Sequence, residues 1–305
     1  EIAEPSPLSI DAHERFKAAR GYGRVADLEP SESDLQKIIE FCKAQFDISL
    51  HTLHLIRNYA ATWLGLGDGL AVPWRHVPHT MINTKVSGAR RFVAQSWSMG
   101  RIRAVSRAAD VTINDVVLAM CAGALRRYLE EHDELPKHSL RALVPVSVRR
   151  ENDFDSPVAI SYIVADLGTR QEDPIDRLET IIESTRAGKA MLSELSPREA
   201  SLYATLIQTP LFVASMMGVA DWFPPVSTVI SNVPGPRQPL YLNGAALQGV
   251  YPMSAVFHGF ALNITFVSYH DNLDFGIVAC RQTVPHVHRP LDDLEPSLAE
   301  LEAAV

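Results

Sequence analysis

The clearest pattern along the chain is an apolar stripe at helical spacing between residues 112 and 131. Thr112 is a residue type that favours the N-cap position, and Asp115, three residues later, completes a variant of the capping box. The apolar residues that follow share one helix face: Ile113, Val116, Val117, Met120, Cys121, Ala124 and Tyr128. The pattern predicts a long helix over residues 112–131.

Helix-like and strand-like segments alternate from residue 91 to the end, which predicts an α/β fold. Strands rich in β-branched and apolar residues are expected at 92–97, 140–148, 158–167 and 226–230. Residues 261–269 and 273–280 flank the turn-forming triplet His270-Asp271-Asn272 as a hairpin. Further helices are expected at 99–109, from Asp173-Pro174, from Ser196-Pro197 and at 290–304.

The first 90 residues show a different pattern. Residues 1–30 mix proline, serine and charge and are interpreted as irregular, and residues 31–67 carry helical spacing after a possible N-cap at Ser31. Residues 68–90 contain glycine, proline and clustered polar residues, which is typical of a linker or a long loop. We therefore expect a helical linker region at 1–80 and a larger α/β unit at 81–305.

The composition is that of a globular protein, since 47% of the residues are hydrophobic and allow a sizeable core. A formal net charge of −8 argues against nucleic-acid binding, which needs basic surface to displace counterions. Local arginine clusters remain compatible with a phosphate-bearing ligand. The three cysteines Cys42, Cys121 and Cys280 have no metal-like spacing, which favours a reducing, cytoplasmic compartment.

Two features bear on targeting. The chain begins at Glu1 and shows no basic, apolar leader, so we expect a processed chain or a fragment without a signal peptide. The uncharged stretch at 200–220 is long enough to span a bilayer. Its polar residues, together with Pro210, favour two buried helical segments joined at that proline.

Common catalytic signatures are missing from the sequence, among them a Gly-rich phosphate loop and a Gly-x-Ser-x-Gly elbow. The pairs His51–His54 and His76–His79 have no cysteine or carboxylate at a metal-ligand offset, so they are interpreted as polar histidines on loops or helix faces. No metal site is expected.

Asn114 and Asp115 open the strongest helix, and two interpretations stay open. Asp115 could simply cap the helix and favour its positive end. Alternatively, the helix start faces a cleft, where both side chains orient a catalytic group or stabilise developing negative charge.

The segment Ser231-Asn232-Val233-Pro234-Gly235-Pro236 ends a strand in a stiff turn, because two prolines fix the backbone around one glycine. Two interpretations stay open. The segment is an ordinary turn, or its rigidity holds Ser231 and Asn232 at the mouth of a site. The basic pairs Arg90-Arg91, Arg126-Arg127 and Arg149-Arg150 are either solvated surface or contacts for a nucleotide phosphate.

Five segments of this chain resemble, in the same order, motifs of the bacterial wax ester synthase/diacylglycerol acyltransferase family. They are Ser87-Gly88-Ala89-Arg90-Arg91-Phe92, Thr112–Ala119, Leu143–Arg149, Ser231–Pro236 and Asn272-Leu273-Asp274-Phe275-Gly276. The resemblance runs from about residue 80 to the end. It implies a chloramphenicol acetyltransferase-like fold, also that of condensation domains, in which two α/β subdomains enclose a tunnel. Residues 81–305 would form the C-terminal subdomain, a mixed sheet flanked by helices.

The resemblance also implies transfer of a fatty acyl group from acyl-CoA, as co-substrate without a resident cofactor, to diacylglycerol or a long-chain alcohol. Asn114 and Asp115 would position the reactants. The expected contacts to substrate or coenzyme A are Arg90, Arg91, Arg149, Ser231, Asn232 and Gly235. Since the acceptor is a lipid, we expect a cytoplasmic protein associated peripherally with membrane or lipid droplets.

One departure from the family pattern is serious: the catalytic His-His-x-x-x-Asp-Gly motif occurs nowhere in these 305 residues. The second histidine of that motif is the family's general base. We expect this chain to be a C-terminal portion whose N-terminal portion is a second chain. The alternatives are a non-catalytic lipid- or partner-binding domain of the same fold and a condensation-type acyltransferase.

Overall fold

A computed structural model describes residues 71–147, 160–193 and 224–305, with scattered residues between 193 and 224. The chain divides into two compact units, residues 1–51 and 52–305, and everything described here belongs to the second. The helices expected at 31–67 and from Ser196-Pro197 lie outside the described residues or largely so, as does most of the linker region expected at 1–80.

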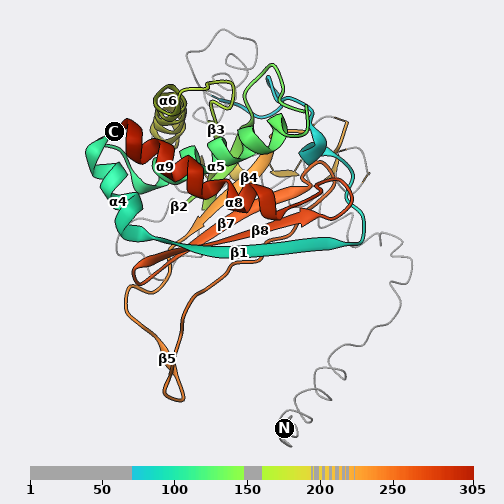
Figure 1. The fold of residues 1–305 in the computed structure, drawn as a ribbon. Helices are drawn as coiled ribbons and strands as arrows, with labels where there is room; N and C mark the ends of the chain where they lie inside the picture. The colour runs from blue at the N-terminus through green and yellow to red at the C-terminus, as the bar shows by residue number, and fades with distance from the viewer. Residues whose placement is uncertain are drawn as a thin grey trace, which may run out of the picture. The chain divides into compact units, whose positions relative to one another are not determined.

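The centre of the unit is a six-stranded mixed sheet, which the alternating pattern predicted (Figure 1). Its spatial order is β1 (Arg90–Ser98), β8 (Asn272–Cys280), β7 (Leu262–Tyr269), β4 (Thr228–Val233), β2 (Arg141–Ser147) and β3 (Ile160–Asp166). Strand β4 runs parallel to both β7 and β2, and the other neighbours are antiparallel.

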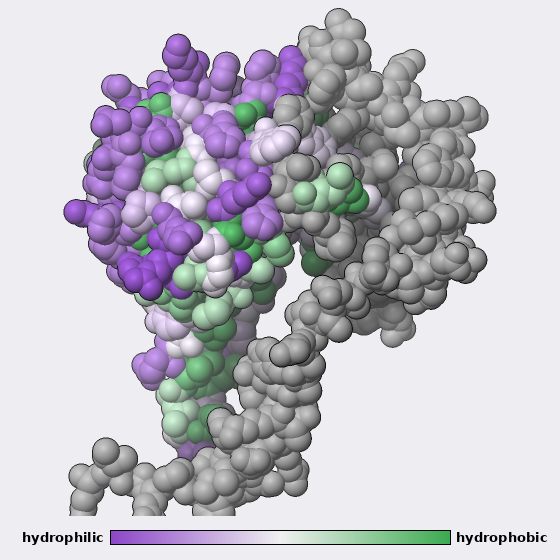
Figure 2. Space-filling view, turned by 90° about the vertical axis from the view of Figure 1, so that its right-hand side faces the viewer, coloured by the Kyte–Doolittle hydropathy of each residue, from purple (hydrophilic) through white to green (hydrophobic). Residues whose placement is uncertain are grey.

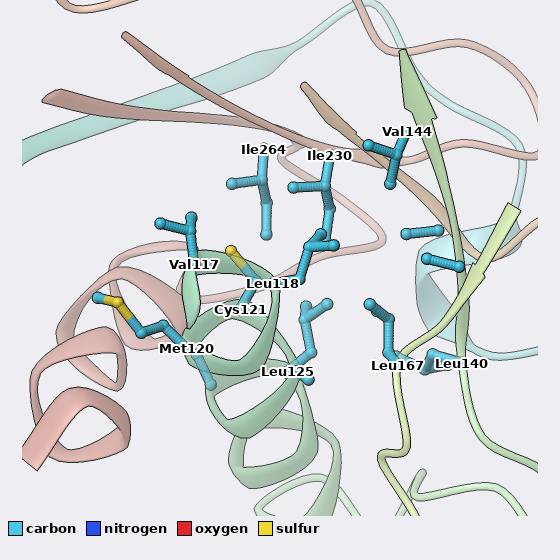
Figure 3. Packing of buried hydrophobic residues seen from close by; sticks show 14 of the residues in the cluster. Val117, Leu118, Met120, Cys121, Leu125, Leu140, Val144, Leu167, Ile230 and Ile264 are labelled. Atoms are coloured by element: carbon cyan, nitrogen blue, oxygen red, sulfur yellow. The ribbon is translucent and has the colours of Figure 1, made fainter. Parts of the chain in front are cut away.

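Helices cover one face of this sheet (Figure 1). They are α4 (Met99–Ala108), α5 (Ile113–Glu130), α6 (Pro174–Ser193), α8 (His288–Asp292) and α9 (Leu294–Ala304). Figure 3 shows how α5 supplies the core: Val117, Leu118, Cys121 and Leu125 point toward Ile230 and Ile264 on the sheet. The α5 side chains shown are fully buried, so this interface provides much of the hydrophobic stabilisation.

Local sequence signals placed several elements correctly. The predicted capping box at the start of α5 is confirmed, since the Thr112 side chain accepts the Asp115 amide and Asp115 accepts the Thr112 amide. The predicted hairpin is confirmed as β7 and β8, with Tyr269 paired to Asn272 across the turn. His270 adopts a φ of 51°, the left-handed conformation that a tight turn requires.

The single helix expected at 290–304 is wrong, because the structure has two helices, α8 and α9, separated at Asp293. Pro296 explains the break. Proline has no amide hydrogen, and its ring clashes with the carbonyl four residues earlier, here that of Asp292. A continuous helix therefore cannot pass this point, and Asp293 becomes the N-cap of α9.

The segment before β1 has little regular structure beyond a short 3-10 helix, η1 (Met81–Asn83), but it is packed rather than solvated. Val72 and Ile82 are fully buried. The Asn83 side-chain amide donates to the carbonyls of Val226, Ser227 and Gly259 at 2.9–3.2 Å. This loop therefore contributes to the core instead of acting as a free linker.

A hairpin arm leaves the body between β4 and β7 and carries the short strands β5 (Tyr241–Leu242) and β6 (Ala245–Ala246) (Figure 1). Among the described residues, no single helix is long and apolar enough to cross a membrane. Helices α4 and α5 meet that criterion only when joined, and they are bent by 104°. The uncharged stretch at 200–220 lies largely outside the described residues.

Candidate functional site

The first candidate site lies at the amino-terminal end of α5. Asp115 is buried there, and its two carboxylate oxygens accept separate hydrogen bonds. One oxygen accepts the Thr112 hydroxyl at 2.6 Å and the Thr112 amide at 3.3 Å. The other accepts the hydroxyl of Thr185 on α6 at 2.9 Å. Asp115 therefore caps α5 and ties it to α6, and both of its oxygens are occupied by donors.

An open pocket of about 660 Å³ borders this contact. Its walls come from the start of α5 and the second half of α6, and they combine two carboxylates, two cations, three hydroxyls and apolar side chains. The lining residues are Asp110, Val111, Thr112, Asp115, Ile182, Thr185, Arg186, Lys189, Ala190 and Ser193. Asn114 is half-buried and does not line the pocket. Of the expected positioning pair, Asp115 alone faces this cavity.

The segment at 231–236 is partly strand and partly turn. Ser231 and Asn232 are paired with β7 as members of β4, which extends three residues further than expected. Gly235 donates its amide to the Ser268 hydroxyl at 3.2 Å. A Cβ at Gly235 would lie 2.2 Å from the Ser268 carbonyl oxygen, so only glycine allows this approach.

Arg90 and Arg91 begin β1 and are exposed, as a role in ligand binding would require. Arg90 also donates to the backbone carbonyl of Ser87. Arg149, the third arginine expected to contact coenzyme A, lies outside the described residues.

The pair Arg126-Arg127 has internal partners. Arg126 donates to the backbone carbonyl of Thr169 at 2.7 Å and pairs with Glu130 at 2.6 Å. Arg127 pairs with Glu300 on α9. This pair therefore joins α5 to its neighbours.

The structure does not bring the expected site residues into one place. Across the sheet, Ser231 is in register with Ala94 of β1, three residues beyond Arg91 and three strands away. With 3.3 Å per residue and 4.8 Å per strand, Ser231 and Arg91 lie about 17 Å apart. Asp115 belongs to the helical layer that covers the sheet. The structure therefore places Arg91, Ser231 and Asp115 at three separate locations.

Sequence analysis missed a buried polar cluster on the sheet face that has no helices. Asp274 is fully buried and accepts the Ser96 hydroxyl at 2.6 Å and the Val250 amide at 2.7 Å. Ser96 also contacts the Tyr251 hydroxyl at 3.0 Å. The signal was present, because an aspartate between Leu273 and Phe275 is unusual in a buried strand.

No described histidine is set up as an obvious general base. His79 contacts the backbone carbonyl of Asp221 at 3.1 Å, and His258 accepts the Val86 amide at 3.2 Å. His270 pairs with Asp271 at 3.2 Å on the exposed hairpin turn. In the part of the chain that the structure describes, no group of three or more His, Cys, Asp or Glu side chains could hold a metal ion.

Cys280 at the end of β8 has an unusual electrostatic environment. Burial raises the pKa of its thiol, but hydrogen bonds, among them those from Ser87, outweigh this effect and bring the pKa to about 6. The Ser87 amide donates to the sulfur at 3.3 Å. Cys280 is fully buried, so its sulfur is not an accessible nucleophile.

Comparison with family models gives two matches in chain order. Residues 33–117 match the wax ester synthase/diacylglycerol acyltransferase catalytic domain, and residues 159–302 match the WS/DGAT C-terminal domain. A putative diacylglycerol O-acyltransferase of Mycobacterium tuberculosis is 51% identical over 229 residues, 75% of this chain and 51% of the relative. The O-acyltransferase WSD of Acinetobacter baylyi is 36% identical over 277 residues, 91% of this chain and 60% of the relative.

Solved structures agree with these matches. The wax ester synthase/diacylglycerol acyltransferase from Marinobacter aquaeolei superposes with a TM-score of 0.67 at 42% identity, covering 75% of this chain and 52% of that one. The starter condensation domain of rhizomide synthetase superposes with a TM-score of 0.52 at 12% identity, covering 88% of this chain and 56% of that one. The predicted chloramphenicol acetyltransferase-like fold is confirmed. The chain spans about half the length of the curated relatives it matches.

Proposed function

Because the chain belongs to the wax ester synthase/diacylglycerol acyltransferase family, we propose that it is the C-terminal part of an O-acyltransferase. The reaction would transfer a fatty acyl group from acyl-CoA to diacylglycerol or a long-chain alcohol, giving triacylglycerol or wax ester. The observation that carries this proposal is that both family models match in order. Strand β1 from the first match pairs along its whole length with β8 from the second, so the matched segments build one sheet.

The general base of this reaction would come from a His-His-x-x-x-Asp-Gly segment, which these 305 residues do not contain. That histidine would accept the proton of the acceptor hydroxyl as its oxygen attacks the thioester carbonyl. The carbon–sulfur bond then breaks, the ester forms, and the coenzyme A thiolate takes up the proton. This chain would bind and orient the reactants.

Within this chain, Asp115 would act as a positioning residue, because its oxygens already accept hydrogen bonds and hold α5 against α6. Asn114 at the same helix end is half-buried and would reach the reactants or the partner's base. Arg90 and Arg91, with Arg149, remain our proposed contacts for the phosphates of coenzyme A. Ser231, Asn232 and Gly235 would line the mouth of the tunnel.

The hairpin arm supports association with a second polypeptide, for which we propose the N-terminal portion that carries the His-His motif. Residues 238–257 contain no charged side chain, yet Leu242 and Met253 are 78% and 69% exposed. Figure 2 shows hydrophobic surface on the arm that projects below the more polar body. Leu240, Tyr241 and Leu247 are also exposed on the arm, and Tyr251 and Phe257 are exposed in the segment that follows it. So large an apolar surface is typical of an interface.

We also propose peripheral contact with membrane or lipid droplets, since diacylglycerol resides in lipid. Release of the whole enzyme from membranes by carbonate or high salt is the expected result. Retention in the membrane until detergent is added would contradict it.

The test of the proposed function is an acyl-transfer assay on this chain alone and after coexpression with a segment bearing the His-His motif. We expect no turnover from the chain alone, stable copurification of the two parts, and activity from the complex. Full activity from this chain alone would refute the proposal. Copurification without turnover would favour the non-catalytic binding domain instead.

The arm offers a matched pair of variants for the association step. Replacing Tyr241 and Leu242 by serine removes two exposed apolar side chains and should weaken the complex about tenfold or more. Ile160→Ser, on the edge strand β3, removes one apolar side chain that is 45% exposed and should leave the affinity unchanged. Equal effects of both changes would place the interface elsewhere.

A further inference from the structure

Four basic side chains meet near the amino-terminal end of β2. Arg75 and His76 come from the loop before η1, His138 from the loop before β2, and Arg141 is the first residue of that strand. The imidazole rings of His76 and His138 have centroids 5.5 Å apart. We call these four residues the basic cluster.

Backbone hydrogen bonds hold the loops of the basic cluster in place. The Arg141 amide donates to the Ser227 hydroxyl at 3.1 Å, and the Arg141 carbonyl accepts the Ser227 amide at 2.7 Å. The Trp74 amide donates to the Pro225 carbonyl at 2.9 Å. Because three chain segments fix one another here, the loops that carry the basic cluster are held together.

Burial and neighbouring charges oppose protonation within the basic cluster. Burial, together with the charges of Arg75, Arg141 and His138, lowers the pKa of His76. Burial also lowers the pKa of Arg141, with Arg75 adding to the effect and Asp166 opposing it. The Asp166 carboxylate lies 3.7 Å from the Arg141 guanidinium, beyond hydrogen-bonding distance.

One hydrogen-bond donor of the Arg141 side chain is unsatisfied. Its Nε is buried and has no hydrogen-bond partner among the described residues. A ligand cannot reach this buried atom, but the Arg141 side chain as a whole is 13% exposed and is reached at its exposed edge. His76 and His138 are exposed, which leaves the basic cluster accessible from solvent.

We propose that the basic cluster binds a phosphate group, through the guanidinium of Arg141 and the imidazoles of His76 and His138. A phosphate monoester offers several acceptor oxygens and a double negative charge, which matches a guanidinium flanked by further cations. The site is separate from Arg91, because the strand order places four strand spacings, about 19 Å, between Arg141 and β1. The inference does not depend on acyl transfer.

The experiment is a titration of the whole chain with inorganic phosphate, followed by NMR of the histidine ring protons in low-chloride buffer. We expect saturable shifts of the His76 and His138 signals and a rise of the His76 pKa as the anion binds. His138→Gln should weaken phosphate binding about threefold to tenfold, and Arg141→Gln about tenfold or more.

The matched control is His286→Gln. His286 and His288 are also exposed, with ring centroids 5.8 Å apart, but they lie outside the basic cluster. This change should leave phosphate affinity unaltered. Equal weakening by His286→Gln and His138→Gln, or no saturable response at millimolar phosphate, would overturn the proposal. If Arg141→Gln does not fold, the exposed His138→Gln still decides the outcome.

Two further probes identify the source of the phosphate. Adenosine 3′,5′-bisphosphate presents the phosphate chemistry of a nucleotide co-substrate, and vesicles containing phosphatidic acid present that of a lipid headgroup. Tighter binding of the nucleotide assigns the basic cluster to the co-substrate, and tighter binding of the vesicles assigns it to the lipid surface. Binding no tighter than that of inorganic phosphate supports a site for the free anion.

Discussion

The hydrogen bond between Asp115 and Thr185 should contribute strongly to the packing of α5 against α6. We propose Thr185→Val as the perturbation, because valine keeps the side-chain volume and removes only the hydroxyl donor. Thr185 is 2% exposed and Asp115 is 4% exposed, so water in the bordering pocket touches this contact over only a small area. The change leaves one oxygen of a buried carboxylate without its donor.

The magnitude follows from that geometry. A hydrogen bond to a charged group contributes about 1.5–3 kcal/mol to the free energy of unfolding. The Thr185 hydroxyl also lies 3.3 Å from the Ile182 carbonyl, a weaker alternative acceptor that valine cannot use. We therefore expect Thr185→Val to lower the unfolding free energy by about 2 kcal/mol, or Tm by roughly 4–8 °C for a unit of this size.

Urea unfolding of the whole chain, followed by circular dichroism, measures the effect. Thr180→Val is the control, because this threonine lies on the same helix and bonds only the Asp176 carbonyl one turn earlier. A double-mutant cycle with Asp115→Asn isolates the pairwise coupling. A loss below about 0.5 kcal/mol for Thr185→Val, equal to that of Thr180→Val, would refute the reasoning.

Three further predictions follow from the same structure. Arg90→Ala combined with Arg91→Ala should raise KM for acyl-CoA about tenfold in the reconstituted enzyme and spare KM for the acceptor, and a change in the acceptor KM alone would be contrary evidence. Gly276→Ala should cost about 2–4 kcal/mol in urea unfolding, because its Cβ would lie 1.9 Å from the Pro252 carbonyl, whereas Gly88→Ala, with open space around it, should be nearly neutral. Since the pKa of Cys280 is depressed to about 6 in the folded state, its stabilisation is present above the unfolded pKa of about 8.5 and disappears toward pH 6. Cys280→Ala should remove that pH dependence, and parallel stability curves for the two proteins would contradict this.

The elements that sequence analysis placed well are those whose signals are local. The cap of α5 needs only Thr112 and Asp115, three residues apart, and the β7–β8 hairpin needs only a turn between two apolar strands. The break between α8 and α9 has a local signal too, since Pro296 follows Pro290 by six residues. One proline within a helical pattern is tolerated at the first turn, and a second proline six residues later is not.

The functional features that sequence analysis missed depend on contacts between distant segments. Asn83 bonds carbonyls more than 140 residues away, and Asp274 bonds Ser96 across 178 residues. The basic cluster joins residues near 75 with residues near 140. No periodicity or spacing reports such pairs, because they arise from strand order and register. The same limit applies to Arg91 and Ser231, whose separation follows only once the sheet order is known.

The motifs that carried the family resemblance have a common structural consequence. Gly235 fits against the Ser268 carbonyl, and Gly276 fits against that of Pro252. Asp274 holds the Val250 amide, just after the arm returns to the body. Both ends of the hairpin arm are therefore clamped to the sheet by motif residues. A clamp of this kind fixes the direction of an otherwise unsupported apolar arm, which reduces the entropy cost of docking it onto a second polypeptide. If the arm docks onto an N-terminal portion, as we propose, loosening these motifs should weaken assembly of the two parts before it alters the chemical step.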